Sequence, residues 1–255
     1  MENKFNKKNL LSIYFTAGYP KLNDTATIIK ALDDNKVDVI EIGLPYSDPL
    51  ADGETIQLSS AEALKNGINL NIIFNQLENI LPHLSHAKPV LMGYFNQLLK
   101  YGLEQFLQKC HSLKIDTVII PDLPFEIYVK NYLDVFEKHN VSPVFLITPQ
   151  TSKKRLLEID RLSNQFIYAV SANSITGNEL KDNSSLIEYL KFLNTLNLKT
   201  PVLLGFGISN AAHFNLACKY LNGGIIGSAF IKALKDSKNI SKTINQFINH
   251  IKSSS

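Results

Sequence analysis

The feature of this sequence that most restricts its fold is a regular alternation between short apolar runs and longer amphipathic runs. Apolar runs of five to seven residues, bounded by turn-forming residues, are typical of buried strands. In the longer runs the apolar residues recur every three or four positions, which indicates helices with one buried face. The expected strands are residues 10–15, 37–42, 89–94, 116–120, 142–148, 165–170, 200–206 and 222–228. Helical patterns between them include residues 24–35, 102–113, 125–139, 185–196 and 210–221.

Eight strand–helix alternations in 255 residues predict a closed parallel (β/α)8 barrel, the TIM-barrel form of the α/β class. Such barrels commonly fill about 250 residues as one domain. We therefore expect a single domain over residues 1–255, with a short N-terminal segment and a frayed C-terminal tail. An open doubly wound sheet is the alternative, but its glycine-rich phosphate loop after the first strand has no counterpart in FTAGYPKLND.

The charged residues do not form a pattern that suggests nucleic acid binding. The net charge of +3 comes from scattered lysines, and the arginines are only Arg155 and Arg161. Bidentate contacts with phosphates and base edges favour arginine over lysine. We therefore expect no nucleic acid partner.

Cysteine usage and hydropathy indicate a reducing compartment and no membrane. Cys110 and Cys218 lie far apart in helical patterns, so they suggest small core residues and neither a disulfide framework nor a metal site. The first residues include lysines but no apolar segment followed by a small-residue cleavage site. No run approaches the roughly 18 apolar residues of a membrane-spanning helix. We expect a soluble, cytoplasmic protein without a metal ion.

A carboxylate interrupts the second expected strand, in the run KVDVIEIGLPYSDPLADGETIQ. Alternate residues of a barrel strand face the interior and the surrounding helices in turn. Ile40 and Ile42 suit the helix-facing side. Glu41 shares the other side with Val39 and Gly43, so it should point inward near the carboxyl end of the strand, where barrel enzymes carry catalytic groups. The alternative is a partly buried glutamate that pairs with a lysine or with backbone amides.

The last two expected strands end in glycine-rich junctions, GFGISNAAH and GGIIGSAFIKAL, which lead into helices. The start of a helix has backbone amides without internal partners, and glycine lets a phosphate approach them closely. Barrels commonly bind phosphate at these two junctions. Gly177, in the loop after the sixth strand, could form a third wall. We predict a phosphate site here; the alternative is that these glycines only form tight turns.

Several motifs follow one another along nearly the whole chain: YFTAGYP, EIGLPYSDPLADGETIQ, DLPFE, LITPQTS, SITG, GFGIS and GSAFIKAL. The second is highly specific, because barrel patterning does not generate so long a run of mixed proline, glycine, aspartate and serine. With these motifs the sequence resembles the tryptophan synthase α chain family. The resemblance implies a lyase of tryptophan biosynthesis that cleaves indole-3-glycerol phosphate to indole and D-glyceraldehyde 3-phosphate, with neither a metal nor an organic cofactor.

The resemblance also assigns the proton-handling roles to two carboxylates. Glu41 matches the main acid–base residue, which protonates C3 of the indole and removes the proton of the adjacent hydroxyl group. Asp52 matches the second carboxylate, which binds the indole N–H and stabilises the protonated ring. Asp48 and Glu54, in the same loop, are expected to be solvated charges.

Other positions match contacts with the substrate. The indole slot would be lined by Tyr14, Met92, Ile119, Leu146, Phe206 and Ile225, with Tyr168 near the reacting carbons. For any one of these residues taken singly, a plain role in the barrel core is the competing interpretation. The phosphate contacts carry over to Gly177, Gly207, Gly227 and Ser228. Thr176 matches the residue that meets Asp52 when the loop after the sixth strand closes.

The resemblance further implies a protein partner. This is the tryptophan synthase β chain, which carries pyridoxal phosphate and condenses indole with serine in an αββα heterotetramer. The loops expected to meet it carry Pro45, Asp48, Pro49 and Asn96, because they would rim the barrel mouth that releases indole. Alternatively, the loop prolines only stiffen a lid over the site.

The chain departs from the family pattern at Tyr19, Glu54, Ala172 and Ser174, which concerns loop closure and coupling to the partner more than the pocket. Three alternative functions remain open. A degenerate α chain would bind ligand and only activate the β chain, although the presence of both carboxylates argues against it. A free-standing lyase would release indole without a partner. Another phosphate-binding barrel, such as an isomerase or synthase of the same pathway, would usually need a catalytic lysine at a strand end. None of the expected strand ends has one.

Overall fold

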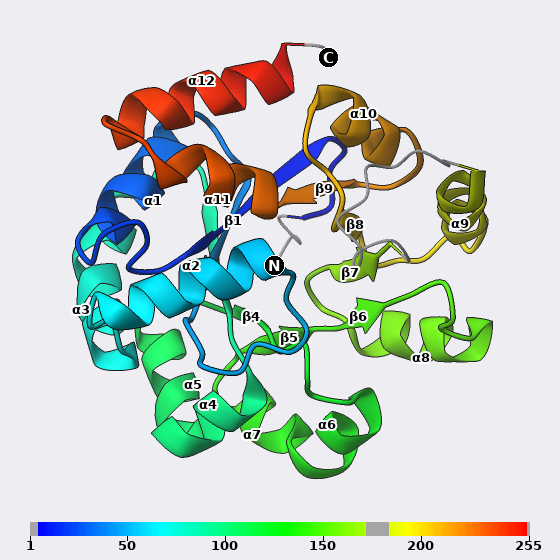
Figure 1. Ribbon diagram of the computed structural model, residues 1–255. Helices are drawn as coiled ribbons and strands as arrows, with labels where there is room; N and C mark the ends of the chain where they lie inside the picture. The colour runs from blue at the N-terminus through cyan, green and yellow to red at the C-terminus, as the bar shows by residue number, and fades with distance from the viewer. Residues whose placement is uncertain (1–4, 172–183, 254–255) are drawn as a thin grey trace.

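The strands of the computed structural model form one parallel sheet that winds into a barrel, with the helices in a ring around it (Figure 1). The structure describes residues 5–171 and 184–253. The strands are β1 (Leu10–Thr16), β2 (Val39–Gly43), β3 (Lys88–Met92), β4 (Thr117–Ile119), β5 (Ser142–Val144), β6 (Leu146–Ile147), β7 (Ile167–Val170), β8 (Val202–Gly205) and β9 (Gly223–Ile226). Their order in the sheet is β5-β4-β3-β2-β1-β9-β8-β7-β6.

The two ends of this strand order are neighbours in the chain. β5 pairs with β4 and β6 pairs with β7, and only Phe145 separates β5 from β6. The predicted strand 142–148 is therefore divided where its pairing passes from one neighbour to the other, which gives nine strand segments in place of eight. Because the pairing passes once around the barrel, the predicted (β/α)8 fold is confirmed and the open doubly wound sheet is ruled out.

The amphipathic runs form the surrounding helices. These are α1 (Asp24–Asp34), α2 (Glu54–Lys65), α3 (Leu70–Ile80), the 3-10 helix η1 (Leu81–His83), α4 (Phe95–Tyr101), α5 (Leu103–Ser112), α6 (Phe125–Asn131), α7 (Leu133–Lys138), α8 (Lys153–Leu162), α9 (Ser184–Thr195), α10 (Ala211–Tyr220), α11 (Ser228–Lys235) and α12 (Ile240–Lys252). Two predictions were wrong in detail. Residues 125–139 form two helices, because Tyr132 leaves the helical region (φ −129°, ψ −10°). Glu54 begins α2 and is not part of the preceding loop.

Strand register decides which side chains face the interior of the barrel, because matched residues on neighbouring strands point to the same side of the sheet. Glu41 is matched with Tyr14 on β1 and Val90 on β3. Met92, two residues beyond Val90, is matched with Ile119. The same face continues through Val144, Leu146, Tyr168, Val170, Leu203, Gly205, Gly223, Ile225 and Ser12. Glu41 therefore faces inward, as its alternation predicted.

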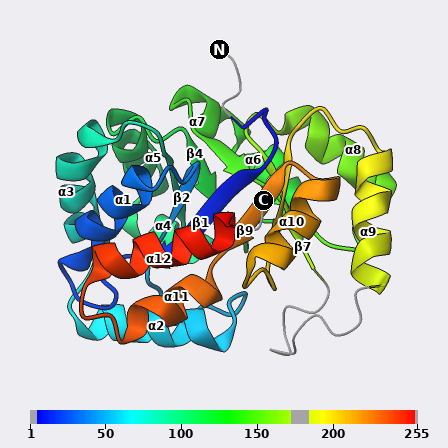
Figure 2. The ribbon, with the colours of Figure 1, turned by 90° about the horizontal axis from the view of Figure 1, so that it is seen from above.

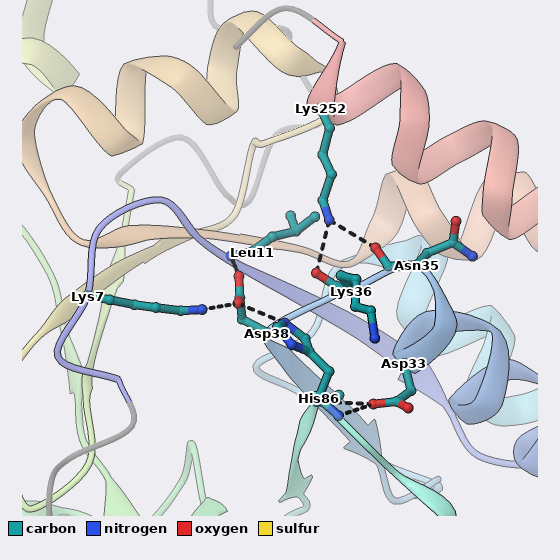
Figure 3. Close-up of polar contacts among 9 residues, drawn as sticks. Lys7, Leu11, Asp33, Asn35, Lys36, Asp38, His86 and Lys252 are labelled. Atoms are coloured by element: carbon teal, nitrogen blue, oxygen red, sulfur yellow. Dashed lines mark hydrogen bonds and ion pairs between the residues drawn. The ribbon is translucent and has the colours of Figure 1, made fainter.

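The amino-terminal end of the barrel is closed partly by a half-exposed ionic cluster (Figure 3). The Asp38 carboxylate, just before β2, accepts a hydrogen bond from the Leu11 amide (2.9 Å) and pairs with Lys7. His86 Nε2 lies 3.3 Å from the same carboxylate. These contacts tie the segment before β1 to the starts of β2 and β3.

Apolar and helix-end contacts complete this closure. Phe5 is buried, and its ring centroid lies 5.0 Å from that of Phe166. From the far end of the chain, Lys252 Nζ donates to the carbonyl oxygens of Asn35 and Lys36 at 2.9 Å each (Figure 3). Figure 2 shows the lead-in to β1 at one end of the barrel and α2 at the other end. The segment before β1 occupies the amino-terminal end, so a site is expected at the carboxyl ends of the strands. Within the described residues, no helix has the length and apolarity to cross a membrane.

Candidate active site

Glu41 is the buried carboxylate on the inner face of β2. Its residue exposure is 0%, and the Ser12 hydroxyl donates to Oε1 at 2.6 Å. The other oxygen, Oε2, has no hydrogen-bond partner among the described residues. Burial raises the pKa of this carboxyl to about 7, although the Ser12 hydrogen bond lowers it. The alternative pairing with a lysine or with backbone amides is not found in the described part of the chain.

Asp52 is a second buried carboxylate, in the loop between β2 and α2. It is 9% exposed, and the Tyr94 hydroxyl donates to Oδ2 at 2.9 Å. The same hydroxyl accepts a hydrogen bond from the Ala51 amide at 3.0 Å, which fixes the loop. Oδ1 has no partner among the described residues. Burial raises the pKa of Asp52 to about 6, and the hydrogen bond from Tyr94 opposes the shift.

Two tyrosines bring the carboxylates into one electrostatic environment. Burial raises the pKa of Tyr14 and of Tyr168, and the negative charges of both Asp52 and Glu41 raise them further. Both hydroxyls therefore stay neutral in the physiological range and lie within the field of both acids. A Cβ atom added at Gly43 would lie 2.2 Å from Tyr14 Oη, and one at Gly205 would lie 2.0 Å from the Tyr168 ring. Glycine at these two positions makes room for the tyrosine rings.

The predicted indole contacts all lie around these tyrosines or on the same inner face. Strand register places Met92, Ile119, Leu146 and Ile225 on the side of Glu41, as described above. Phe206 follows β8 directly and packs against Tyr168, with ring centroids 6.1 Å apart. Its φ of 65° lies in the left-handed region, which is unusual for a bulky residue and is typical of strained functional positions.

The two glycine-rich junctions differ in how the following helix begins. After β8, Gly207 is exposed with a φ of 79°, but α10 is already capped, since the Asn210 side chain accepts from the His213 amide at 2.9 Å. After β9, Gly227 precedes α11 without a side-chain cap, and Ser228 at its start is exposed. The start of α11 is therefore the better place for an anion to meet backbone amides.

The residues expected to contact a partner lie beside a surface cavity of about 620 Å³. Pro45, Asp48 and Asn96 belong to its lining. Asp48 and Asn96 are exposed, whereas Pro45 and Pro49 are buried, so the two prolines present little surface. Leu50, which the sequence interpretation did not single out, is 91% exposed.

Comparisons with known proteins place this geometry in a family. The family model of the tryptophan synthase alpha chain matches residues 1–254. The chain belongs to the tryptophan synthase alpha chain family. Its reaction is the aldol-type cleavage of indole-3-glycerol phosphate, so the chain is a lyase. The alternative of another phosphate-binding barrel is thereby ruled out.

Individual relatives match almost the whole length of the chain. The alpha chain of Flavobacterium johnsoniae is 52% identical over 245 residues, which are 96% of each chain. That of Flavobacterium psychrophilum is 51% identical over 244 residues, covering 96% of this chain and 95% of the relative. The solved tryptophan synthase A-subunit of Pyrococcus furiosus has a TM-score of 0.86 at 31% identity, covering 96% of this chain and 98% of that one.

Two residues of this candidate site were not named from the sequence. Ser12 stands in the apolar run LLSIYF, and a polar residue at an inward position of a strand was a usable signal. Tyr94 was included in an expected strand, and nothing local relates it to Asp52. Thr176 and Gly177 lie outside the described residues, as do Ala172 and Ser174. Among the described residues, no cluster of three or more His, Cys, Asp or Glu side chains is arranged to hold a metal ion.

Proposed function

We propose that Glu41 and Asp52 carry out the proton transfers of this cleavage at the carboxyl end of the barrel. The supporting observation is that the two acids have the same kind of surroundings. Each is buried, each has one oxygen held by a hydroxyl group, and each has a second oxygen without a partner in the described residues. A buried acceptor without a partner is costly, so the two free oxygens fit groups that a substrate would supply.

The chemistry assigns different protonation states to the two acids. Glu41 begins protonated and gives its proton to C3 of the indole, while the Asp52 carboxylate accepts the ring N–H and stabilises the positive charge. The Glu41 carboxylate then takes the proton of the hydroxyl on the carbon next to C3. As that oxygen becomes a carbonyl, the bond to C3 breaks and its electron pair restores the neutral indole. Glu41 is again protonated and the aldehyde product is released.

The remaining inward side chains suit an indole ring with a phosphorylated side chain. We assign the apolar walls to Tyr14, Met92, Ile119, Leu146, Phe206 and Ile225, with Tyr168 beside the reacting carbons. The phosphate is assigned to Gly207, Gly227 and Ser228, with the start of α11 as the main contact because it has no side-chain cap. Thr176 and Gly177 remain predictions from the sequence.

The pH dependence of kcat/KM should be a narrow bell. Activity should fall below about pH 6 as Asp52 becomes protonated and above about pH 7 as Glu41 loses its proton, since burial raises the pKa of each group to these values. The substrate phosphate also titrates near pH 6, so the alkaline limb is the decisive one. A rate that stayed constant from pH 7 to pH 9 would contradict a protonated Glu41 as the starting acid.

Replacing Gly227 by valine should weaken the binding of phosphate-bearing ligands much more than the binding of indole. A Cβ atom at Gly227 would make ordinary contacts, 3.5 Å from Tyr14 and 3.7 Å from Ile56, so alanine fits and serves as the control. The larger valine would obstruct the backbone approach of the phosphate to α11. Calorimetric titrations with glycerol phosphate and with indole measure the two effects. Equal weakening of both ligands would argue against a local phosphate site.

We also propose that the chain acts as one domain in the cytoplasm, with no cofactor of its own, in an αββα complex with a β chain that carries pyridoxal phosphate. The contact would use Pro45, Asp48, Pro49 and Asn96. Leu50 supports this surface, because its side chain is 91% exposed and it follows Asp48, which lines the cavity, by two residues. Docking there would shift the loop that carries Asp52 towards its closed form.

A cognate β chain should raise the rate of indole release from indole-3-glycerol phosphate by at least about tenfold, or about 1.4 kcal/mol of barrier. Leu50→Asp should abolish this stimulation and the complex seen by sedimentation, while retaining the basal rate. Leu162→Asp, the same change on the 38% exposed Leu162 of α8, is the control. Stimulation that survives in Leu50→Asp would exclude this docking face. No indole from the wild-type chain even in a single turnover would instead indicate a degenerate α chain.

A further inference from the structure

Ser12 is a polar residue in the middle of an apolar strand. It is fully buried on β1, facing the barrel interior, and its hydroxyl lies 2.6 Å from Glu41 Oε1. The hydroxyl donates this hydrogen bond, because Oε1 can accept it whether or not the other oxygen, Oε2, carries a proton. Among the described residues no other hydrogen bond reaches the Glu41 carboxyl group, and Oε2 remains without a partner.

We propose that Ser12 is a positioning residue that anchors Oε1 of Glu41 and thereby leaves Oε2 as the atom that exchanges protons with the substrate. The catalytic value of this anchor rests on the proposed function, in which Glu41 is the acid–base group. Two consequences follow from the geometry. The Glu41 side chain is held in one orientation, and the charged form of its carboxyl is favoured over what burial alone would allow.

Of the groups that face Glu41, Ser12 is the one that opposes the effect of burial on the pKa of its carboxyl. Tyr14 from β1 and Tyr168 from β7 lie within its electrostatic field, and both stay neutral because their pKa values are raised. Asp52, from the loop before α2, acts on the same two hydroxyls and contributes only negative charge. Burial raises the pKa of Glu41 to about 7, and the bond from Ser12 is the factor that lowers it. Without that hydroxyl the carboxyl should hold its proton to a higher pH.

An infrared titration of the free enzyme tests this directly, without activity. The C=O stretch of a protonated buried carboxyl is followed against pH, and the Glu41 band is identified by its loss in Glu41→Gln. In Ser12→Ala the midpoint of this band should move up by about one pH unit, given the usual strength of a hydrogen bond to a charged group. Ser12→Thr, which keeps the hydroxyl, should restore the wild-type midpoint. Ser12→Cys keeps the size with a weaker donor and should lie between, so it tests the same point if Ser12→Ala does not fold.

Kinetics then separates the positioning role from the proposed function. In Ser12→Ala the alkaline limb of kcat/KM should move with the infrared midpoint, and kcat should fall by up to about 100-fold, the scale for a misplaced catalytic group, with KM nearly unchanged. The control is Thr200→Val, just before β8, which removes a buried hydroxyl that donates to the carbonyls of Asp160 and Ser163 at the end of α8. Thr200→Val should lower stability without changing the infrared midpoint of Glu41 or the alkaline limb of kcat/KM.

An unchanged Glu41 midpoint in both Ser12→Ala and Ser12→Cys would overturn the inference, and any loss of stability would then show a purely structural hydroxyl. A midpoint that moves while the alkaline limb stays fixed would support the anchor but overturn the proposed acid–base role of Glu41.

Discussion

Replacing Glu41 by glutamine should lower the rate of indole release from indole-3-glycerol phosphate by more than about 1,000-fold, towards the upper end of the range for a positioned acid–base group. In the proposed mechanism one residue serves both proton transfers, first as the acid at C3 and then as the base at the hydroxyl. An amide can do neither at the working pH. Because glutamine has nearly the same size, binding of indole and of glycerol phosphate should be almost unaffected.

The same replacement should not weaken the fold. Glu41 is fully buried, and burial raises the pKa of its carboxyl to about 7, so the ionised form is costly in the folded protein above that pH. Glutamine removes this cost and keeps an oxygen that can accept from Ser12. At pH 8 the urea midpoint of Glu41→Gln should therefore equal or exceed that of the wild type.

The matched control is Glu54→Gln, the same change at the exposed first residue of α2. It should leave indole release within about twofold of the wild-type rate, because it leaves both buried acids in place. Turnover by Glu41→Gln within about tenfold of the wild type would show that another group transfers the protons.

Asp52→Asn should have the second largest effect, a loss of roughly 100-fold in kcat, comparable to the removal of one group that stabilises transition-state charge. The asparagine oxygen can still accept the indole N–H and the hydrogen bond from Tyr94. It cannot offer the negative charge that, in the proposed mechanism, stabilises the protonated ring. We therefore expect residual activity above that of Glu41→Gln, measured as indole release at saturating substrate.

Asp48→Asn is the control for this second change, since Asp48 stands in the same loop. Asp48 is exposed and bonded to the neighbouring Ser47 hydroxyl at 2.5 Å, whereas Asp52 is 9% exposed. Asp48→Asn should retain the basal rate of the isolated chain. Equal losses from the two replacements would mean that the wrong carboxylate of this loop has been assigned to the indole N–H.

Local patterns were enough to predict the barrel and the side of β2 on which Glu41 lies. Alternation along a strand needs only its immediate neighbours, and Ile40 and Ile42 already indicated the helix-facing side. The choice between Asp48 and Asp52 was different, because periodicity does not distinguish two aspartates in one loop. That choice came from the resemblance of a whole motif, and the structure shows that Asp52 is the buried one.

The hydrogen bonds that hold the two acids could not be predicted from the sequence. Ser12 and Glu41 are 29 positions apart, and Asp52 and Tyr94 are 42 apart. The first contact depends on the register between β1 and β2, and the second on the path of the loop before α2. The absence of a side-chain cap at α11 is likewise a matter of backbone geometry that GGIIGS does not reveal.

By itself, the sequence determined the barrel, its family and its inward-facing acid, because amphipathicity, strand alternation and a long specific motif are properties of neighbouring residues. Only the tertiary structure decided how the site is tuned. The raised pKa values of Glu41 and Asp52 come from burial, and their orientations come from single hydroxyl groups on distant segments. Desolvation and hydrogen bonding depend on which groups the fold brings within a few ångströms, and separation along the chain does not contain that information.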